Sequence, residues 1–194
     1  MRIVAGEFRG RRLVAPKGEA TRPTADRVRE ALFSTISSLA GPSLGGGRVL
    51  DAFAGSGALG LEALSRGLEH VTFVDTDRGA LAALNTNIAA LGVQSRAIVT
   101  QGDSTVLSTR GAIRGGPFAL LLLDPPYRLD AGAIGRLVSE LIAHDLLEEG
   151  AIIVYEHATG VAASWPAGVS SIARKRYGST EVDIANLGKG TESA

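Results

Sequence analysis

The sequence contains no cysteine, and its 194 residues include only one methionine, one tryptophan and three histidines. Without cysteine the chain can have no disulfide, no thiolate nucleophile and no cysteine metal site. The histidines, at positions 70, 144 and 157, lack the spacing of metal ligands, so we expect no metal. The sequence also lacks an apolar run of the roughly 18 residues that a membrane-spanning helix needs. We therefore expect a soluble, cytoplasmic, monomeric protein with no membrane partner.

The chain also has no net charge, because 20 basic and 20 acidic residues balance. This balance hides an asymmetry: residues 1–48 contain nine basic and four acidic residues, whereas residues 49–194 contain eleven basic and sixteen acidic ones. A basic segment of this kind can bind a polyanion, or it can be a solvated surface on which charges cluster by chance. The composition, 45% hydrophobic and 21% charged, is that of a globular chain.

The chain divides at about residue 47. Residues 2–15 contain two short apolar stretches around a Gly- and Arg-rich middle, which predicts a hairpin or two edge segments with an arginine-bearing turn. A helix is expected from Thr24 or Asp26 to about Ala40, followed by a glycine linker. We therefore interpret residues 1–47 as a basic N-terminal extension.

From residue 48 onward, short apolar runs alternate with segments of helical periodicity, which indicates βαβ units and a mostly parallel sheet. The last two runs are joined by a short turn and predict an antiparallel pair. This α/β domain spans residues 48–187, and residues 188–194 are expected to be a disordered tail. Strands are expected at residues 48–53, 70–75, 97–103, 118–124, 151–156, 171–179 and 180–187, and helices at residues 56–66, 78–91 and 131–144.

A glycine-rich loop follows the first of these strands. Gly55, Gly57 and Gly60 have the Gly-x-Gly-x-x-Gly spacing of a nucleotide-binding turn. Asp75 ends the second strand, where an acid can bind the hydroxyls of a ribose. These features favour a nucleoside-containing cofactor, but they do not separate NAD from S-adenosylmethionine, and a glycine-rich turn without a ligand stays open.

Two features favour S-adenosylmethionine. Asp51 precedes the glycines, where its charge would repel a pyrophosphate and attract the ammonium and sulfonium groups of a methionine moiety. Asp124-Pro125-Pro126-Tyr127 follows the most apolar strand. An exocyclic amine of a nucleobase is a poor nucleophile, because its lone pair is delocalised into the ring. The Asp124 carboxylate and the Pro125 carbonyl can accept hydrogen bonds from its two N–H groups and localise that lone pair, while Tyr127 stacks on the base. The alternative is a rigid turn with a capping aspartate.

Asp103 ends the third strand, where it can accept a hydrogen bond from the adenine amino group or serve as an ordinary helix N-cap. Four strand ends thus carry an aspartate, and these should line one crevice at the carboxyl edge of the sheet. The predicted cofactor-binding residues in these loops are Asp51, Ala54, Gly55, Ser56, Gly57, Asp75, Thr76, Asp103 and Ser104.

These motifs resemble those of the Rossmann-like S-adenosylmethionine-dependent methyltransferases. More narrowly, the chain resembles the RsmD family of bacterial 16S rRNA guanine-N2 methyltransferases, on the strength of residues 2–13, 22–33, 51–67 and 124–127. The resemblance implies a seven-stranded sheet whose last strand is antiparallel, preceded by a small hairpin and helix. It also implies that Arg22 and Thr24 close over the methionine end of the cofactor. The family usually has glutamate where this chain has Asp75.

The resemblance further implies methyl transfer from S-adenosylmethionine, with S-adenosylhomocysteine as product. The acceptor would be the N2 of a guanine in 16S rRNA, within the small ribosomal subunit or an assembly intermediate.

Arginines suit phosphate contacts because the guanidinium bonds bidentately. The basic residues 174–176 can extend the RNA-binding surface or be solvated. Glu156 can be a pocket residue or a helix cap. The predicted RNA contacts are Arg9, Arg11, Arg12, Arg27 and Arg128.

Two other functions stay open. An adenine-N6 nucleic-acid methyltransferase would use the same chemistry, but the sequence leaves no sizeable target-recognition region once the sheet is counted. A non-catalytic RNA-binding factor of ribosome assembly could retain the cofactor fold.

Overall fold

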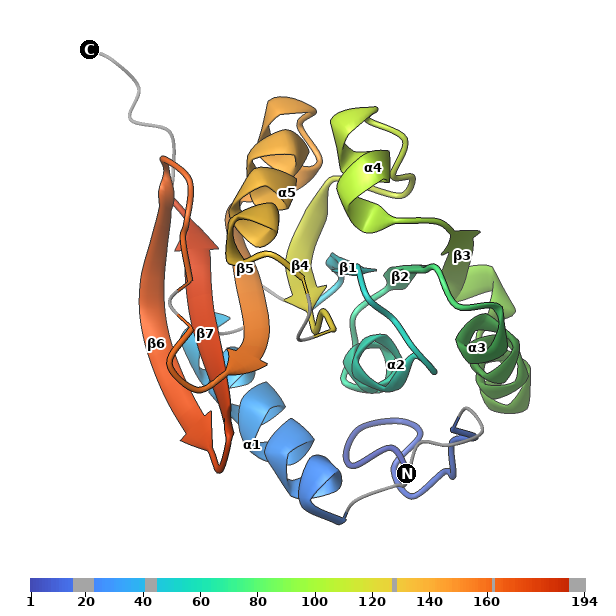
Figure 1. Ribbon diagram of the computed structural model, residues 1–194. Helices are drawn as coiled ribbons and strands as arrows, with labels where there is room; N and C mark the ends of the chain where they lie inside the picture. Colours follow the sequence, from blue (N-terminus) through green and yellow to red (C-terminus); the bar gives the residue numbers. More distant parts are fainter. Residues whose placement is uncertain (16–22, 41–44, 127–128, 162, 189–194) are drawn as a thin grey trace.

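The protein folds into a seven-stranded sheet that is covered by helices on both faces (Figure 1). The computed structural model describes residues 1–15, 23–40, 45–126, 129–161 and 163–188. The strand order is β3-β2-β1-β4-β5-β7-β6. β7 is antiparallel to β5 and β6, and the other strands run parallel to one another. The predicted Rossmann-like α/β fold is therefore confirmed. The strands are β1 (Arg48–Asp51), β2 (His70–Asp75), β3 (Ala97–Gln101), β4 (Phe118–Leu123), β5 (Leu147–Ala158), β6 (Val169–Tyr177) and β7 (Thr180–Leu187).

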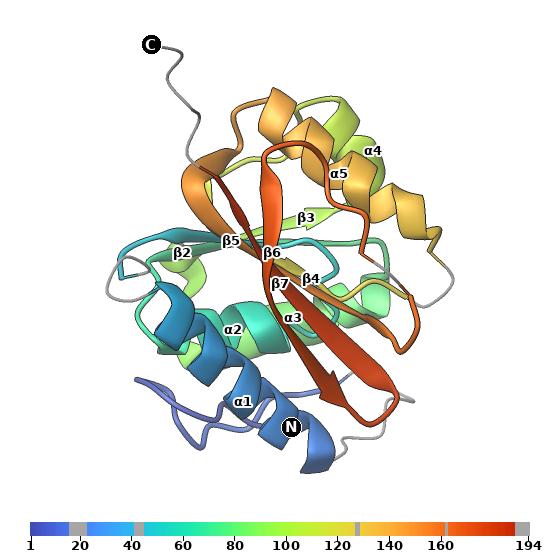
Figure 2. The same ribbon diagram turned by 90° about the vertical axis from the view of Figure 1, so that its left-hand side faces the viewer.

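Two helical layers enclose the sheet. α4 (Ser104–Thr109) and α5 (Ala131–Ala143) cover one face, and α1 (Pro23–Ala40), α2 (Ala58–Ser65) and α3 (Arg78–Leu91) cover the other (Figures 1 and 2). Every residue of β4 is buried, because side chains alternate between two covered faces. Leu120 and Leu122 pack in the core beneath α1 and α2, whereas Leu121 and Leu123 pack in the core beneath α5.

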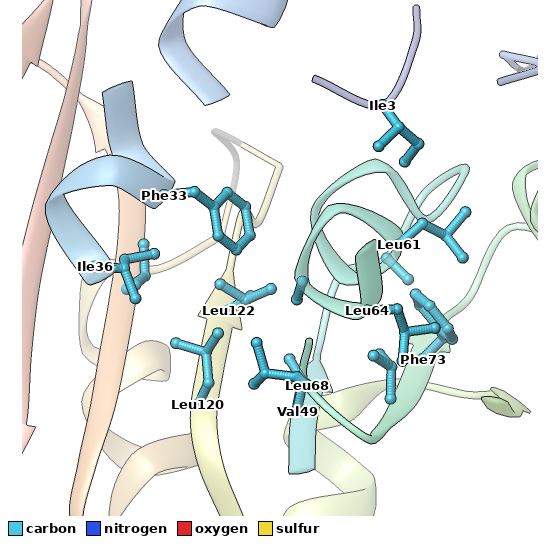
Figure 3. Close-up of a cluster of buried hydrophobic side chains, with 14 of the residues drawn as sticks. Ile3, Phe33, Ile36, Val49, Leu61, Leu64, Leu68, Phe73, Leu120 and Leu122 are labelled. Atoms are coloured by element: carbon cyan, nitrogen blue, oxygen red, sulfur yellow. The ribbon is translucent and has the colours of Figure 1, made fainter. Parts of the chain in front are cut away.

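The N-terminal arm (residues 1–15) packs on α2 and shares a hydrophobic core with the sheet. Ile3 is fully buried, and Figure 3 shows it above Leu61 of α2, in the same cluster as Phe33 of α1. The arm folds back on itself, with one antiparallel bridge between Arg2 and Arg12. The expected hairpin therefore takes the form of two edge segments rather than two regular strands.

Several expected boundaries were wrong by a few residues. β1 ends at Asp51 and α2 begins at Ala58, because residues 52–57 form the glycine-rich turn between them. β3 ends at Gln101, since the chain then turns into α4, a six-residue helix that the sequence pattern did not indicate. β5 begins at Leu147 instead of residue 151 and ends at Ala158.

Gly188, the first residue of the expected tail, still donates a backbone hydrogen bond to Gly168 at 2.8 Å, and residues 189–194 lie outside the described part of the chain. Among the described helices, none combines the length and the apolarity that crossing a membrane requires.

Candidate active site

The four aspartates of the predicted crevice end four neighbouring strands, in the spatial order Asp103, Asp75, Asp51, Asp124. Because these strands are parallel, all four residues lie at the carboxyl edge of the sheet. Asp51 pairs with Phe73 of β2 and is therefore two residues deeper than Asp75. It likewise pairs with Leu122 of β4, two residues before Asp124. The edge is thus stepped, with Asp51 at its floor and the other aspartates at its rim.

Asp51 is buried, with 1% of its surface exposed. Its Oδ2 accepts a hydrogen bond from the Gly60 N–H at 2.9 Å, whereas its Oδ1 is buried and has no hydrogen-bond partner among the described residues. The pKa of Asp51 is raised to about 7, chiefly by burial; the hydrogen bond from the Gly60 N–H lowers it, and the nearby charge of Asp75 adds to the rise. A buried carboxyl with an unsatisfied oxygen is suited to a cationic ligand, which would restore its charge.

The glycine-rich turn is held by Asp75. The Asp75 Oδ2 accepts from the Gly55 N–H at 2.7 Å, and its Oδ1 accepts from the Asp77 N–H at 2.8 Å. Gly57 has a φ of +83°, and a Cβ there would lie 2.3 Å from Leu84 Cδ1, so glycine is required at this position. Each Asp75 oxygen retains a lone pair for a ribose hydroxyl. Asp75 therefore shapes the turn through both of its carboxylate oxygens.

Asp103 is the N-cap of α4, as one of its two predicted roles requires. Its Oδ1 accepts from the Thr105 N–H at 2.8 Å and from the Thr105 hydroxyl at 2.6 Å. The Ser104 hydroxyl is buried and donates to the Ala52 carbonyl at 2.5 Å, so its side chain serves the fold. Thr76 is exposed directly after β2, whereas Ala54 and Ser56 of the glycine-rich turn are buried.

The predicted catalytic motif begins directly after β4, at the same edge. Asp124 is exposed there and Pro125 is buried, so the motif is anchored on one side and open on the other. The Leu129 N–H donates to the Pro126 carbonyl at 2.9 Å and closes the loop. Tyr127, Arg128 and Arg22 lie outside the described residues, and Thr24 lies in the first turn of α1, where only its backbone is described.

The predicted RNA contacts differ in their environment. Arg9, Arg12 and Arg27 are exposed. Arg11 is also exposed, but its guanidinium donates to the Ala90 carbonyl of α3 and so helps to hold the arm in place.

On the far edge strand β6, Arg174 of the 174–176 run pairs with the buried Asp183, with its Nε 2.7 Å from the Asp183 Oδ1. Glu156 lies within β5, so its possible role as a helix cap is wrong. Burial raises the pKa of the Glu156 carboxyl, and the charge of His157 opposes this shift.

Two buried polar residues near the site were missed from the sequence. Glu62 of α2 is fully buried and accepts hydrogen bonds from the Val4 N–H at 2.7 Å and the Ala5 N–H at 3.0 Å. Asn87 of α3 is also buried and hydrogen-bonds to Val14. The available signal for Glu62 was a single acid in an otherwise apolar helix, ALGLEALS. Asn87 had no comparable signal, because the two residues before it in α3, Asn85 and Thr86, are also polar.

Comparisons with known proteins agree with this geometry. The profile of the family described as Conserved hypothetical protein 95 matches residues 1–186. The chain belongs to this family. The YlbH protein of Bacillus subtilis (strain 168), whose name assigns it provisionally to the rRNA methyltransferases, is 40% identical over 185 residues, covering 95% of this chain and 97% of that protein. The ribosomal RNA small subunit methyltransferase D of Escherichia coli (strain K12) is 36% identical over 156 residues, 80% of this chain and 74% of that protein. The resemblance to the RsmD family is therefore confirmed.

Solved structures lead to the same fold. The Escherichia coli protein yhhF is 32% identical to this chain, with a TM-score of 0.80 over 97% of this chain and 98% of the yhhF chain. The Thermus thermophilus protein TTHA0928 is also 32% identical, with a TM-score of 0.75 over 95% of this chain and 98% of that chain.

Proposed function

We propose that this protein transfers the methyl group of S-adenosylmethionine to the exocyclic N2 of a guanine in 16S rRNA. The arrangement that carries the proposal is the pair of aspartates at the ends of the adjacent strands β1 and β4: buried Asp51, with one unsatisfied oxygen, and exposed Asp124, followed by buried Pro125. One is suited to a cationic cofactor and the other to an amine. The names of relatives support rRNA of the small subunit as the substrate.

The residues at the carboxyl edge of the sheet fit this cofactor. The unsatisfied Oδ1 of Asp51 would accept from the methionine ammonium, and the two oxygens of Asp75 would accept from the ribose hydroxyls. Asp103, beyond β3, would contact the adenine amino group with the oxygen that does not cap α4. When bound, S-adenosylmethionine supplies an electrophilic methyl group on a sulfonium.

The residues of the β4 loop would prepare the amine. The Asp124 carboxylate and the Pro125 carbonyl accept hydrogen bonds from the two N2–H groups, so that the nitrogen lone pair points at the methyl carbon. The N–C bond then forms as the S–C bond breaks, and the surplus proton leaves from the nitrogen through Asp124 to solvent. Two prolines hold both acceptors in place, and positioning of this kind is worth effective molarities on the order of 10⁵ M.

The substrate is proposed to be an assembled or partly assembled small subunit in the cytoplasm. A guanine inside folded rRNA must be exposed or flipped before it can reach Asp124. Arg9, Arg12 and Arg27 would contact phosphates around it, Tyr127 would stack on the base, and the enzyme would act as a monomer.

Replacement of the amine acceptor tests the proposal. We expect Asp124→Ala to lower the transfer rate at least about a thousandfold, because both positioning and lone-pair localisation are lost, while the affinity for S-adenosylmethionine stays within about threefold of wild type. The rate is measured with radiolabelled S-adenosylmethionine and small subunits from a strain that lacks the modification. Asp130→Ala is the matched control, because Asp130 lies in the same loop and pairs with the exposed Arg136.

The nucleoside that carries the label decides between the alternatives. Label in N2-methylguanosine supports the proposed specificity, and label in N6-methyladenosine contradicts it. Cofactor binding by the wild type without transfer to any RNA would favour the non-catalytic assembly factor. Equal loss of transfer and cofactor affinity in Asp124→Ala would refute the role of Asp124 at the amine.

A further inference from the structure

Asn87 joins two segments that are far apart in the sequence. It lies on α3 with 1% of its surface exposed. Its Oδ1 accepts from the Val14 N–H at 2.7 Å, and its Nδ2 donates to the Val14 carbonyl at 3.0 Å. The same Nδ2 donates to the Ser56 carbonyl at 3.0 Å. One buried amide therefore holds the end of the N-terminal arm and the middle of the glycine-rich turn.

The glycine-rich turn needs such a restraint. Gly55 and Gly57 flank Ser56 and both have positive φ, so this backbone has little preference of its own for the conformation that it adopts. Asp75 fixes the turn from one side through the Gly55 N–H. Asn87 fixes it from the other side through the Ser56 carbonyl. Both donor hydrogens of the amide are used, so no other side-chain type of this size can make the same set of bonds.

The arm depends on the same amide. Val14 uses both its backbone N–H and its carbonyl on Asn87, as a strand would use a neighbouring strand. The exposed Arg9 and Arg12 belong to this arm. Asn87 therefore links the end of the arm directly to the backbone that would contact the cofactor, in addition to the bonds that the arm makes with Glu62 and Ser65 of α2.

We propose that Asn87 is a positioning residue that couples cofactor binding at the glycine-rich turn to the docking of the N-terminal arm. The inference rests on the proposed function for the identity of the cofactor, and its test needs no RNA. Coupling of this kind is reciprocal: a cofactor that orders the turn also orders the arm, and an arm held by substrate phosphates tightens cofactor binding.

Binding of S-adenosylhomocysteine to full-length variants, measured by calorimetry, tests the turn. Asn87→Leu removes all three hydrogen bonds, whereas Asn87→Asp keeps the acceptor for Val14 and lacks a donor for Ser56. Because a buried carbonyl loses its partner in both, we expect the dissociation constant to rise about tenfold or more in each. Asn85→Leu is the matched control, because Asn85 lies two residues away on the exposed side of α3, and it should bind as the wild type does.

Cleavage by trypsin after Arg9 and Arg12, located by mass spectrometry, tests the arm. Saturating S-adenosylhomocysteine should slow this cleavage several-fold in the wild type and in Asn85→Leu, and should have no effect in Asn87→Leu. A role in stability alone would change cleavage equally with and without the ligand.

Wild-type affinity in both Asn87 variants, or cleavage of the wild type that the ligand does not slow, would overturn the inference alone. A wild-type protein that binds neither S-adenosylmethionine nor S-adenosylhomocysteine would overturn the proposed function, and this inference with it.

Discussion

At the scale of single residues, the burial of the Asp51 carboxyl makes the stability of the folded protein depend on pH. The pKa of Asp51 is raised from its ordinary value of 3.8 to about 7 because the charged form loses its hydration. The folded protein thus keeps a proton that the unfolded chain releases above about pH 4. The stabilisation that this bound proton gives to the folded state is complete below about pH 4 and is lost as the pH rises through about 7. A cationic ligand reverses this disadvantage, because it stabilises the charged form.

Asp51 therefore predicts a pH-dependent affinity. From pH 6 to pH 8 the dissociation constant for S-adenosylmethionine should fall, and the fall should be smaller for S-adenosylhomocysteine, which has no sulfonium charge. Asp51→Asn should abolish this dependence and, without ligand, raise the unfolding free energy at pH 8 by about 1–3 kcal/mol. Calorimetric titrations and urea denaturation at several pH values measure both effects. An advantage of the variant that persists unchanged at pH 4 would show that Asp51 is not the titrating group.

At the scale of elements, some signals in the sequence were sufficient. The bounds of β2, α3 and β7 agree with the prediction. For α3 the sequence contains both a start and a stop signal. Asp77 caps α3 by accepting from the Ala80 N–H, and Gly92 ends the helix in the left-handed conformation. α4 escaped prediction because the segment STVLST is rich in β-branched and hydroxyl residues, and Asp103 supplies the cap that starts it.

The arm shows why other elements cannot be predicted from the sequence. Besides the bonds between its own two segments, several of its backbone groups pair with polar side chains of α2 and α3. The Phe8 N–H donates to the Ser65 hydroxyl at 2.9 Å, across 57 residues of sequence. No periodicity in residues 1–15 reports these partners, which depend on the whole fold.

A pair of glycines in the arm gives a matched test of its docking. Gly6 and Gly10 both have a φ above +80°, so alanine is strained at either position by about 1–2 kcal/mol. A Cβ on Gly6 would lie 1.7 Å from the Ser65 carbonyl oxygen, whereas a Cβ on Gly10 would meet nothing within 4 Å. Gly6→Ala should therefore lower the unfolding free energy by at least about 3 kcal/mol, and Gly10→Ala by only the strain. Urea denaturation measures the difference. Equal losses in the two variants would mean that the arm does not rest on α2 in solution.

At the scale of the whole molecule, topology accounts for the part of the site that was predictable. Alternation of strands and helices is enough to bring Asp51, Asp75 and Asp124 to one edge of the sheet. It does not reveal that Asp51 lies deeper than the others, or that Glu62 and Asn87 attach the arm to the helices behind the cofactor loops. Those facts depend on register and on contacts between distant segments.

The separation of charge across the molecule leads to the last prediction. Arg9 and Arg12 are exposed on the arm, whereas Arg110 and Arg114 are exposed in the connection between β4 and α4, the helix that covers the other face of the sheet (Figure 1). If RNA docks on the arm, Arg9→Ala with Arg12→Ala should weaken binding of small subunits. It should also reduce the slope of log affinity against log salt by about 0.7 for each lost phosphate contact. Arg110→Ala with Arg114→Ala removes the same charge and should leave the slope unchanged, as measured by filter binding between about 50 and 300 mM salt. Equal changes in both double variants would indicate attraction by overall charge alone. An unchanged slope in the arm variant would remove the arm from the RNA interface.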